Sequence, residues 1–290
     1  MSKKAKLFGY ILGDGWIDVR KNLGISGDKE SLENIATDID ELFGNGSAYK
    51  RTTRETSSIK YGIHGTTSQF PCRRCVSEEF QRLGMPVGKR VNIEYLLPGW
   101  IKNGTRKNKI DFFSGYYAAE GMIPSLQSND ITVRPLTFCF SKSYALIDNS
   151  RELANEFKRI LEDLEISCSI EEKITYTNQK IVKQTIVLQN DEKVFKNFLS
   201  MLTLDYCIKK EQRKELLLSY LREKENIRQQ KTKQVEMVKI DIRNNIPRKE
   251  IEKRYGLTRS QVLGIKQGKS NARKFSFPTF TEFCSKILSN

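Results

Sequence analysis

In the first hundred residues, apolar positions have the two-residue period of strands in some segments and the 3.6-residue period of helices in others. Trp16 to Gly27 has the two-residue period of strands, with a turn near Lys21 and Asn22. From Leu32 to Leu42 the apolar residues recur on one helical face, and Asp28 or Ser31 can cap that helix. The pattern further predicts a hairpin of Ser47–Thr53 and Ser58–Thr66 and a helix of Pro71–Leu83.

The same order of elements recurs after residue 106. Ile131 to Ser141 alternates as a strand, and Ser143 to Leu164 has the period of a long amphipathic helix. A hairpin of 167–177 and 180–189 follows, and then helices of 193–201 and 205–221. Because helix, strands, helix, hairpin and helix occur twice in this order, the sequence predicts an internal structural repeat.

Each half begins with a helix that carries only small side chains on one face. LFGYILGDG (Leu7–Gly15) and FSGYYAAEG (Phe113–Gly121) align small residues spaced four apart, which lets two helix backbones approach closely. These residues are Gly9 and Gly13 in the first copy and Gly115 and Ala119 in the second.

An acidic residue ends each of these helices, Asp14 in the first copy and Glu120 in the second. A negative charge is unfavourable at a helix C-terminus unless a cation lies nearby. If the helices pack with like ends together, Asp14 and Glu120 lie side by side. Two carboxylates held close need a metal ion or a proton between them.

The two segments resemble the signature of the LAGLIDADG homing endonucleases, in the single-chain form that carries two copies. The resemblance covers about Lys6 to Leu221. It implies an α+β fold of two pseudo-symmetric αββαββα halves, whose saddle-shaped antiparallel sheets flank a central two-helix interface. Residues 1–106 and 107–221 would be the halves and 222–290 an appended domain. Gly9, Gly13, Gly115 and Ala119 would form the interface.

By the same resemblance, Asp14 and Glu120 bind a divalent metal, Mg²⁺ or Mn²⁺, and the protein hydrolyses one phosphodiester bond in each DNA strand. Hard oxygen ligands suit Mg²⁺, which keeps several waters and shares phosphate oxygens. The family also tends to place a basic residue near each scissile phosphate. Lys89 and Lys209, or Lys210 instead of Lys209, are the expected ones here. Glu120 and Ala119 depart from the usual motif.

Composition adds a strong charge to this picture. The net charge is +15 and the pI near 9.5, which favours a polyanionic partner such as nucleic acid. No apolar run is long enough for a membrane span, and no signal-peptide pattern follows Met1, so a cytoplasmic protein is expected. The resemblance implies a monomer that needs no protein partner and binds a long double-stranded DNA site.

One face of each sheet is expected to meet the DNA major groove, where basic side chains read base edges. Which residues of each alternating strand face outward stays open, because a one-residue slip inverts the assignment. The candidates are Lys50, Arg51, Arg54, Lys60, Arg134, Lys142, Lys173, Lys180 and Lys183.

The six cysteines do not form a disulfide pattern in a chain of this length. Cys72 and Cys75 have the spacing of zinc ligands. A second such pair is missing, however, and His64 is the only histidine, so reduced thiols are the better interpretation.

The C-terminal quarter carries much of the charge. Residues 222–274 hold 16 Lys or Arg against 6 Asp or Glu, a net of +10. Pro247 to Gly268 has the spacing of a helix-turn-helix, with Gly256 in the turn, Thr258 as a cap and Val235–Ile242 as a supporting helix. Recognition helices read DNA with their N-terminal residues. The expected contacts are Arg259, Ser260, Gln261 and Lys266.

Two other functions fit parts of the pattern. A non-catalytic transcriptional regulator could join a degenerate form of this fold to a helix-turn-helix, and an intron maturase would bind RNA. A pure DNA-binding protein has no need of carboxylates at both helix ends, which favours the nuclease. The ends show no recognisable splicing junctions, so an intein is not expected.

Overall fold

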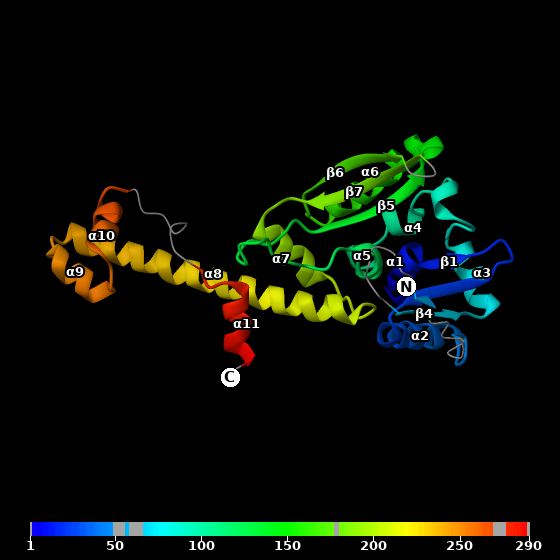
Figure 1. Cartoon of the computed structure of the whole chain (residues 1–290), viewed down its shortest axis with the longest axis horizontal. Coiled ribbons are helices and arrows are strands. Elements are labelled where there is room, and N and C mark those ends of the chain that lie inside the picture. Colours follow the sequence, from blue (N-terminus) through cyan, green and yellow to red (C-terminus); the bar gives the residue numbers. More distant parts are fainter. Residues whose placement is uncertain (1, 49–55, 58–65, 177–179, 269–276, 289–290) are drawn as a thin grey trace. The chain divides into compact units, whose positions relative to one another are not determined.

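The computed structural model describes residues 2–48, 56–57, 66–176, 180–268 and 277–288 (Figure 1). The chain divides into two compact units, one of residues 1–125 and 134–215 and the other of 126–133 and 216–290. Both predicted halves therefore lie in the first unit, and the segment 126–133 belongs with the C-terminal quarter. Among the described residues, no helix is both long and apolar enough to cross a membrane.

The first half of unit 1 alternates helices with short strands. Its elements are α1 (Ser2–Asp14), β1 (Gly15–Ile17), β2 (Leu23–Gly27), α2 (Lys29–Phe43), β3 (Thr56–Ser57), β4 (Thr66–Pro71), α3 (Arg74–Arg82), the 3₁₀ helix η1 (Arg90–Asn92) and α4 (Gly99–Lys102). The Asp28 carboxylate caps α2 by accepting the Ser31 N–H, as the sequence predicts.

The second half of unit 1 repeats this order with longer strands. Its elements are α5 (Arg106–Glu120), β5 (Thr137–Ser143), the 3₁₀ helix η2 (Tyr144–Leu146), α6 (Ile147–Asp163), β6 (Cys168–Tyr176), β7 (Lys180–Leu188), α7 (Glu192–Met201) and the start of α8 (Ile208–Arg243). Thr105 caps α5 and Asp191 caps α7.

Two antiparallel sheets flank the helix pair, which confirms the predicted α+β class. The first sheet has the strand order β1-β2-β4-β3 and the second the order β5-β7-β6. Every pairing within them is antiparallel. In the second sheet Phe113, Tyr116, Phe138 and Phe157 join α5, β5 and α6 in one aromatic cluster. That cluster fixes α5 beneath its sheet.

The first strand of the second half is shorter at its start than the sequence predicts. The strand expected from Ile131 begins only at Thr137, because Pro135 has no N–H for the ladder and Asp130 takes a positive φ of 53° in a turn. Isolated bridges link Gly121 to Phe138 and Leu126 to Val133.

Unit 2 is helical. It contains the rest of α8, then α9 (Arg248–Tyr255), α10 (Arg259–Lys266) and α11 (Phe280–Leu288). The helix predicted to end at residue 221 continues to Arg243 as α8, since residues 208–243 contain neither Gly nor Pro to end a helix. The expected supporting helix, Val235–Ile242, is the last part of α8.

Helices α9 and α10 fold as the spacing predicts. Gly256 ends α9 in the left-handed conformation, and Thr258 and Gln261 form a capping box at the start of α10. A small core of Val235, Val238, Ile251, Val262 and Ile265 holds these two helices on α8.

Candidate active site

Helices α1 and α5 pack at backbone contact through two glycines. A Cβ atom on Gly9 would lie 2.1 Å from the Phe112 carbonyl oxygen, and one on Gly115 would lie 1.8 Å from the Lys6 carbonyl oxygen. Lys6 and Phe112 are equivalent positions in the two halves, so the contacts are reciprocal, as in a two-fold interface. A hydrogen atom is the only side chain that fits at either glycine.

The same seam brings the acidic helix ends together. A Cβ atom on Gly13 would lie 2.3 Å from the Ala119 Cβ and 3.1 Å from the Glu120 Cγ. The side chain of Glu120 is thus laid against the last turn of α1, beside Asp14. Asp14 is exposed and Glu120 is half-buried, so a ligand can reach the pair from solvent.

Both carboxyl groups hold their protons more tightly than usual. Asp14 keeps an open face to solvent, but crowding by protein atoms desolvates it and raises its pKa, against the charges of Lys210 and Arg90. Burial and then the charge of Asp14 raise the pKa of Glu120 to about 7, although Arg90, Lys210 and Lys183 act to lower it. Near neutral pH Glu120 therefore keeps part of its proton, although three cations lie near the pair.

Arg90 closes the end of α1. Its guanidinium donates to the carbonyl oxygens of Ile11 (2.9 Å), Leu12, Gly13 (2.7 Å) and Gly15 (2.8 Å). These last carbonyls of a helix have no intrahelical partner, and a cation there also offsets the negative end of the dipole. This is the cation that an acidic residue at the C-terminus of α1 requires.

Lys210 does the same for α5. Its ammonium group donates to the carbonyl oxygens of Tyr117 (3.2 Å), Ala118 (2.7 Å) and Ala119 (3.0 Å). Lys210 is buried, and this burial lowers its pKa against the charges of Cys207, Asp14 and Glu120. Each half thus sends one cation, from a segment after its last sheet helix, to the end of its central helix.

The cations act on the carboxylates through charge alone. In the part of the chain that the structure describes, neither Asp14 nor Glu120 accepts a hydrogen bond. Arg90 and Lys210 donate to backbone carbonyl oxygens instead. Two adjacent oxygen donors that lack protein partners and are open to solvent form a donor set suited to a hard divalent cation.

Lys89 and Lys209, expected near the scissile phosphates, are exposed neighbours of the two capping residues. The side chains that reach the helix ends are Arg90 and Lys210 instead. Helix periodicity explains Lys210, because on α8 the buried side is the one that carries Lys210, Lys214 and Leu217. The sequence indicates a role for Arg90 only indirectly, because the last carbonyl oxygens of α1 need a cationic donor.

The register of the second sheet shows which residues face away from the helices. Lys183 of β7 pairs with Ser141 of β5 and Lys173 of β6, and both lysines are exposed on the free face. Lys183 is also close enough to Glu120 to lower its pKa. Lys180 lies with its ammonium group 3.2 Å from the centroid of the Tyr144 ring.

The expectation that Lys142 faces DNA is wrong for this structure. Its side chain is fully buried on the helix-facing side of β5, donates to the Ile93 carbonyl oxygen (2.5 Å) and lies 3.6 Å from the centroid of the Tyr95 ring. Lys142 pairs with Val182, one position along from the Ser141–Lys183 pair that faces away from the helices, so its side chain points to the opposite side of the sheet. Burial lowers its pKa to about 8.

The remaining candidates from the sequence are spread over both units. Arg134 is exposed in the segment before β5. Arg259, Ser260, Gln261 and Lys266 are exposed on α10, where Gln261 also accepts the Thr258 N–H as part of its cap. Four further candidates from the first sheet lie outside the described residues: Lys50, Arg51, Arg54 and Lys60.

The structure does not bring cysteines together as metal ligands. Cys72 is buried and Cys75 is exposed, and His64 lies outside the described residues. Within the described ranges, no group of three or more His, Cys, Asp or Glu side chains could hold a metal.

Comparison with known proteins gives a family for part of the chain. Residues 107–203 match the family model of a LAGLIDADG-like domain. This match spans α5, β5, α6, β6, β7 and α7, the elements that carry Glu120. The second half of unit 1 is therefore similar to a LAGLIDADG-like domain.

Curated relatives match most of this chain over a small part of their own length. The tRNA-splicing ligase RtcB of Pyrococcus furiosus is 26% identical over 96% of this chain and 29% of the relative. The replication factor C small subunit of Methanocaldococcus jannaschii is 26% identical over 96% of this chain and 15% of the relative. The DNA-directed RNA polymerase subunit Rpo1N of the same organism is 27% identical over 58% of this chain and 13% of the relative.

Solved structures of similar shape include homing endonucleases. A mesophilic variant of I-DmoI is 15% identical with a TM-score of 0.40, and the match covers 69% of this chain and 88% of that one. I-GzeII in complex with its DNA target is 11% identical with a TM-score of 0.41, over 93% of this chain and 99% of that one.

Proposed function

We propose that this chain is a site-specific DNA endonuclease that uses a divalent metal held by Asp14 and Glu120 to cut both strands of double-stranded DNA. The observation that carries the proposal is the pair of carboxylates at the α1–α5 seam, which have no hydrogen-bond partner among the described residues. Two carboxylates side by side repel each other when both are ionised, and a bound cation would offset that repulsion.

The donor set fits Mg²⁺ or Mn²⁺, since both are bound by carboxylate oxygens and keep waters or substrate oxygens in their other positions. When bound, the ion would lower the pKa of a water that attacks phosphorus and would stabilise the leaving 3′-oxygen. Asp14 and Glu120 would hold it in their ionised forms, so binding releases the proton that Glu120 retains near pH 7.

Arg90 and Lys210 would act through the carboxylates. By neutralising the carbonyl ends of α1 and α5, they permit two negative charges to remain there. Because neither side chain touches the carboxylates, we assign them positioning and charge-balancing roles. Lys183, on the free face of β7 near Glu120, is the described residue best placed to contact a DNA phosphate.

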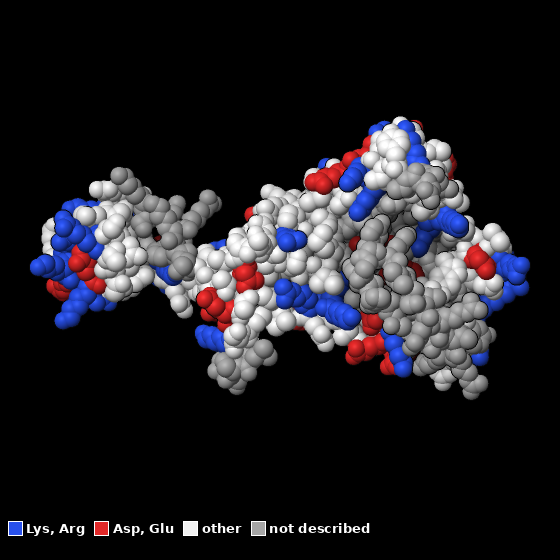
Figure 2. Space-filling view, in the orientation of Figure 1, with Lys and Arg blue, Asp and Glu red and all other residues white. Residues whose placement is uncertain are grey.

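The C-terminal unit would add DNA affinity as a helix-turn-helix module. Lys and Arg gather on the surface around α9 and α10, with acidic patches among them (Figure 2), and Arg254 is paired with Asp241 and Glu250. Arg259, Ser260 and Lys266 project from α10 into solvent, as a recognition helix requires. Phosphate contacts from this unit would extend the bound site and steepen the salt dependence of binding.

The names of the relatives support an activity that belongs to the shared segment itself. A ligase, a replication factor subunit and a polymerase subunit have different activities, yet all three contain a region similar to this chain. Because the similar region occurs in all three proteins, it does not account for their different activities. A nuclease module is consistent with such a distribution, and the family match of residues 107–203 points the same way.

A cleavage screen tests the proposal. The protein is incubated with a library of randomised duplex DNA in Mg²⁺, in Mn²⁺ or in EDTA, and cut ends are sequenced. We expect one preferred site, cut on both strands only with metal. Random nicking that Asp14→Asn and Glu120→Gln proteins reproduce would reveal a contaminating nuclease, and the absence of a preferred site despite tight DNA binding would favour a non-catalytic regulator.

A further inference from the structure

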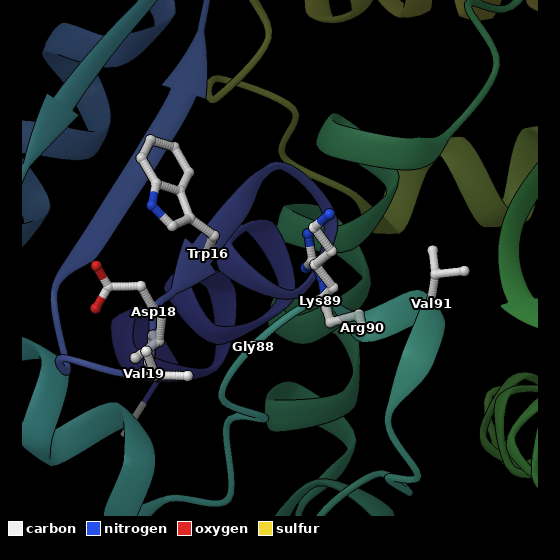
Figure 3. Close-up of a pocket in the computed structure, with 8 residues that line it drawn as sticks. Trp16, Asp18, Val19, Gly88, Lys89, Arg90 and Val91 are labelled. Carbon is white, nitrogen blue, oxygen red and sulfur yellow. The ribbon is translucent and has the colours of Figure 1, made fainter.

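A cavity of about 560 Å³ opens between the β1–β2 hairpin and the segment that leads into η1 (Figure 3). Trp16 and Val19 line one side, and Gly88, Lys89, Arg90 and Val91 line the other. Its volume lies in the range of small-molecule sites in proteins. Trp16 is 38% exposed and Val19 is 85% exposed, so apolar surface faces solvent in a strongly basic chain.

The indole of Trp16 is held in place from one side. Trp16 pairs with Gly24 across β1 and β2, and a Cβ atom on Gly24 would lie 2.0 Å from the Trp16 Cζ2 atom. The ring therefore lies directly against the backbone of β2, in space that a side chain would fill. One face of the Trp16 ring is thus fixed against β2, and another planar ring can stack on the part that is exposed.

The cavity is connected to the proposed active site. Trp16 follows Asp14 by two residues, and Arg90 both lines the cavity and caps the helix that ends in Asp14. The exposed ammonium group of Lys89 adds positive charge at the cavity edge. An occupant is thus expected to combine a flat apolar face with a negative charge.

The second half repeats the exposed apolar residue. Met122 follows Glu120 by two residues, as Trp16 follows Asp14, and it is 46% exposed. A soluble protein has no structural need for a large apolar side chain in solvent immediately after each acidic helix end. The repetition links these side chains to the same ligand that the carboxylates serve.

We infer that the Trp16 cavity binds a nucleobase that leaves the duplex stack next to the bond that is cut, as a base in a single strand already has. The base stacks on the indole, and the phosphate attached to its nucleotide meets Lys89. The inference rests on the proposed function and deepens it, because it names the part of the substrate that this surface recognises. Every base has a π-face, so the contact contributes affinity with little dependence on sequence.

Intrinsic fluorescence can isolate this contact. The chain has two tryptophans. The second, Trp100, donates its indole N–H to the Leu83 carbonyl oxygen and packs against the Phe8 ring of α1. In a Trp100→Phe protein, Trp16 is the only tryptophan, and it is excited at a wavelength that the tyrosines do not absorb. It is titrated, in EDTA so that no cleavage occurs, with a random-sequence 24-mer single strand and with an abasic strand of the same length and charge.

Stacking predicts that the base-containing strand quenches Trp16 emission and that the abasic strand binds with little quenching. Trp16→Ala should weaken binding of the base-containing strand about 10-fold and leave the abasic strand unaffected, while Trp16→Phe should retain most of the affinity. Gly24→Ala, which pushes the ring off its strand without changing its chemistry, should reduce the quenching; a melting curve shows that the variant is folded.

Equal quenching by both strands, or equal loss of both affinities in Trp16→Ala, would show that the indole senses only the backbone and would overturn the inference. Such a result leaves the nuclease proposal standing, since cleavage is measured separately. Failure to bind either single strand would overturn the inference alone; the nuclease proposal falls only if the protein neither binds nor cuts duplex DNA.

Discussion

The two halves of unit 1 satisfy the same helix end with different side chains. At the end of α1, the planar guanidinium of Arg90 reaches four carbonyl oxygens beside an exposed Asp14. At the end of α5, the ammonium group of Lys210 reaches three carbonyl oxygens and is buried, and the carboxylate beside it is the half-buried Glu120. A fork of five donors can cover a wider set of acceptors than an ammonium group can.

This difference shows that a symmetric backbone does not make a symmetric site. The reciprocal glycine contacts place Asp14 and Glu120 equivalently, yet burial and the charge of Asp14 raise the pKa of Glu120 to about 7. The charge state of the pair near neutral pH is therefore set mainly in the second half. Variants that affect one half more than the other can test this asymmetry.

The largest expected effect comes from the seam that both halves share. Gly115→Ala places a Cβ atom 1.8 Å from the Lys6 carbonyl oxygen, and because that atom is backbone, the two helices must separate. We expect a loss of about 3 kcal/mol or more in the free energy of unfolding, from overpacking. Gly9→Ala should behave alike.

Gly99→Ala is the matched control for these two variants, because the nearest heavy atom to its Cβ would be 3.9 Å away. It should change stability little, as measured by urea denaturation. Equal stability of Gly115→Ala and Gly99→Ala would mean that α1 and α5 do not pack through this seam.

Removal of a capping cation should have the next largest effect, and should be larger in the second half. Lys210→Met leaves three carbonyl oxygens of α5 without their donor in a buried setting, which costs about 2 kcal/mol. Loss of its positive charge also raises the pKa of Glu120 further and weakens metal binding.

The exposed neighbour Lys209→Met is the control, and Arg90→Met and Lys89→Met form the equivalent pair in the first half. Thermal melts and Mn²⁺ titration compare the four proteins. If the Lys89 and Lys209 variants lose metal affinity while the Arg90 and Lys210 variants keep it, the roles assigned to Arg90 and Lys210 are wrong.

A smaller effect is expected from pH. The folded protein raises the pKa of Glu120 from its ordinary value of 4.5 to about 7. The group therefore favours the folded state fully below pH 4.5, and this contribution is lost as pH rises through 7. In EDTA, Glu120→Gln should gain in melting temperature relative to the unaltered protein between pH 4.5 and 7.

The Asp14→Asn protein sharpens the same comparison. Since the charge of Asp14 raises the pKa of Glu120, its removal should lower that pKa and shift the window in which stability is lost to lower pH. A melting temperature difference that does not vary with pH would contradict the asymmetric site.

The smallest effect concerns unit 2. Arg259→Ala with Lys266→Ala removes two exposed cations from α10, and the slope of log affinity against log salt should become shallower by about 2 if both meet phosphates. Arg254 and Lys253 on α9 provide a charge-matched control pair. An unchanged slope would mean that α10 does not contact the DNA backbone.

Much of the fold of both units could be predicted from the sequence, because the signals are local. Small residues spaced four apart predict the α1–α5 seam, Asp28 and Thr258 predict helix starts, and Gly256 predicts a turn. The failures came from contacts distant in sequence. Whether Lys142 faces the helices depends on its pairing with Val182, which the alternation alone does not determine.

The candidate site was predictable in its acidic residues and only partly in its cations. Asp14 and Glu120 are marked by position in a repeated motif, whereas Arg90 reaches α1 from 75 or more residues away. Adjacent cations such as Lys89 and Arg90 look equivalent in a sequence. Their roles separate only when the chain turns one of them toward the carbonyl oxygens.

The central claim is that Asp14 and Glu120 together hold the metal that cuts DNA. The most direct measurement compares the unaltered protein with Asp14→Asn and Glu120→Gln for Mn²⁺ binding, DNA affinity and cleavage of the site found in the screen. We predict that both variants lose metal binding and cleavage while DNA affinity stays within about tenfold, or 1.4 kcal/mol. Full cleavage by either variant, with its metal binding intact, would contradict the claim.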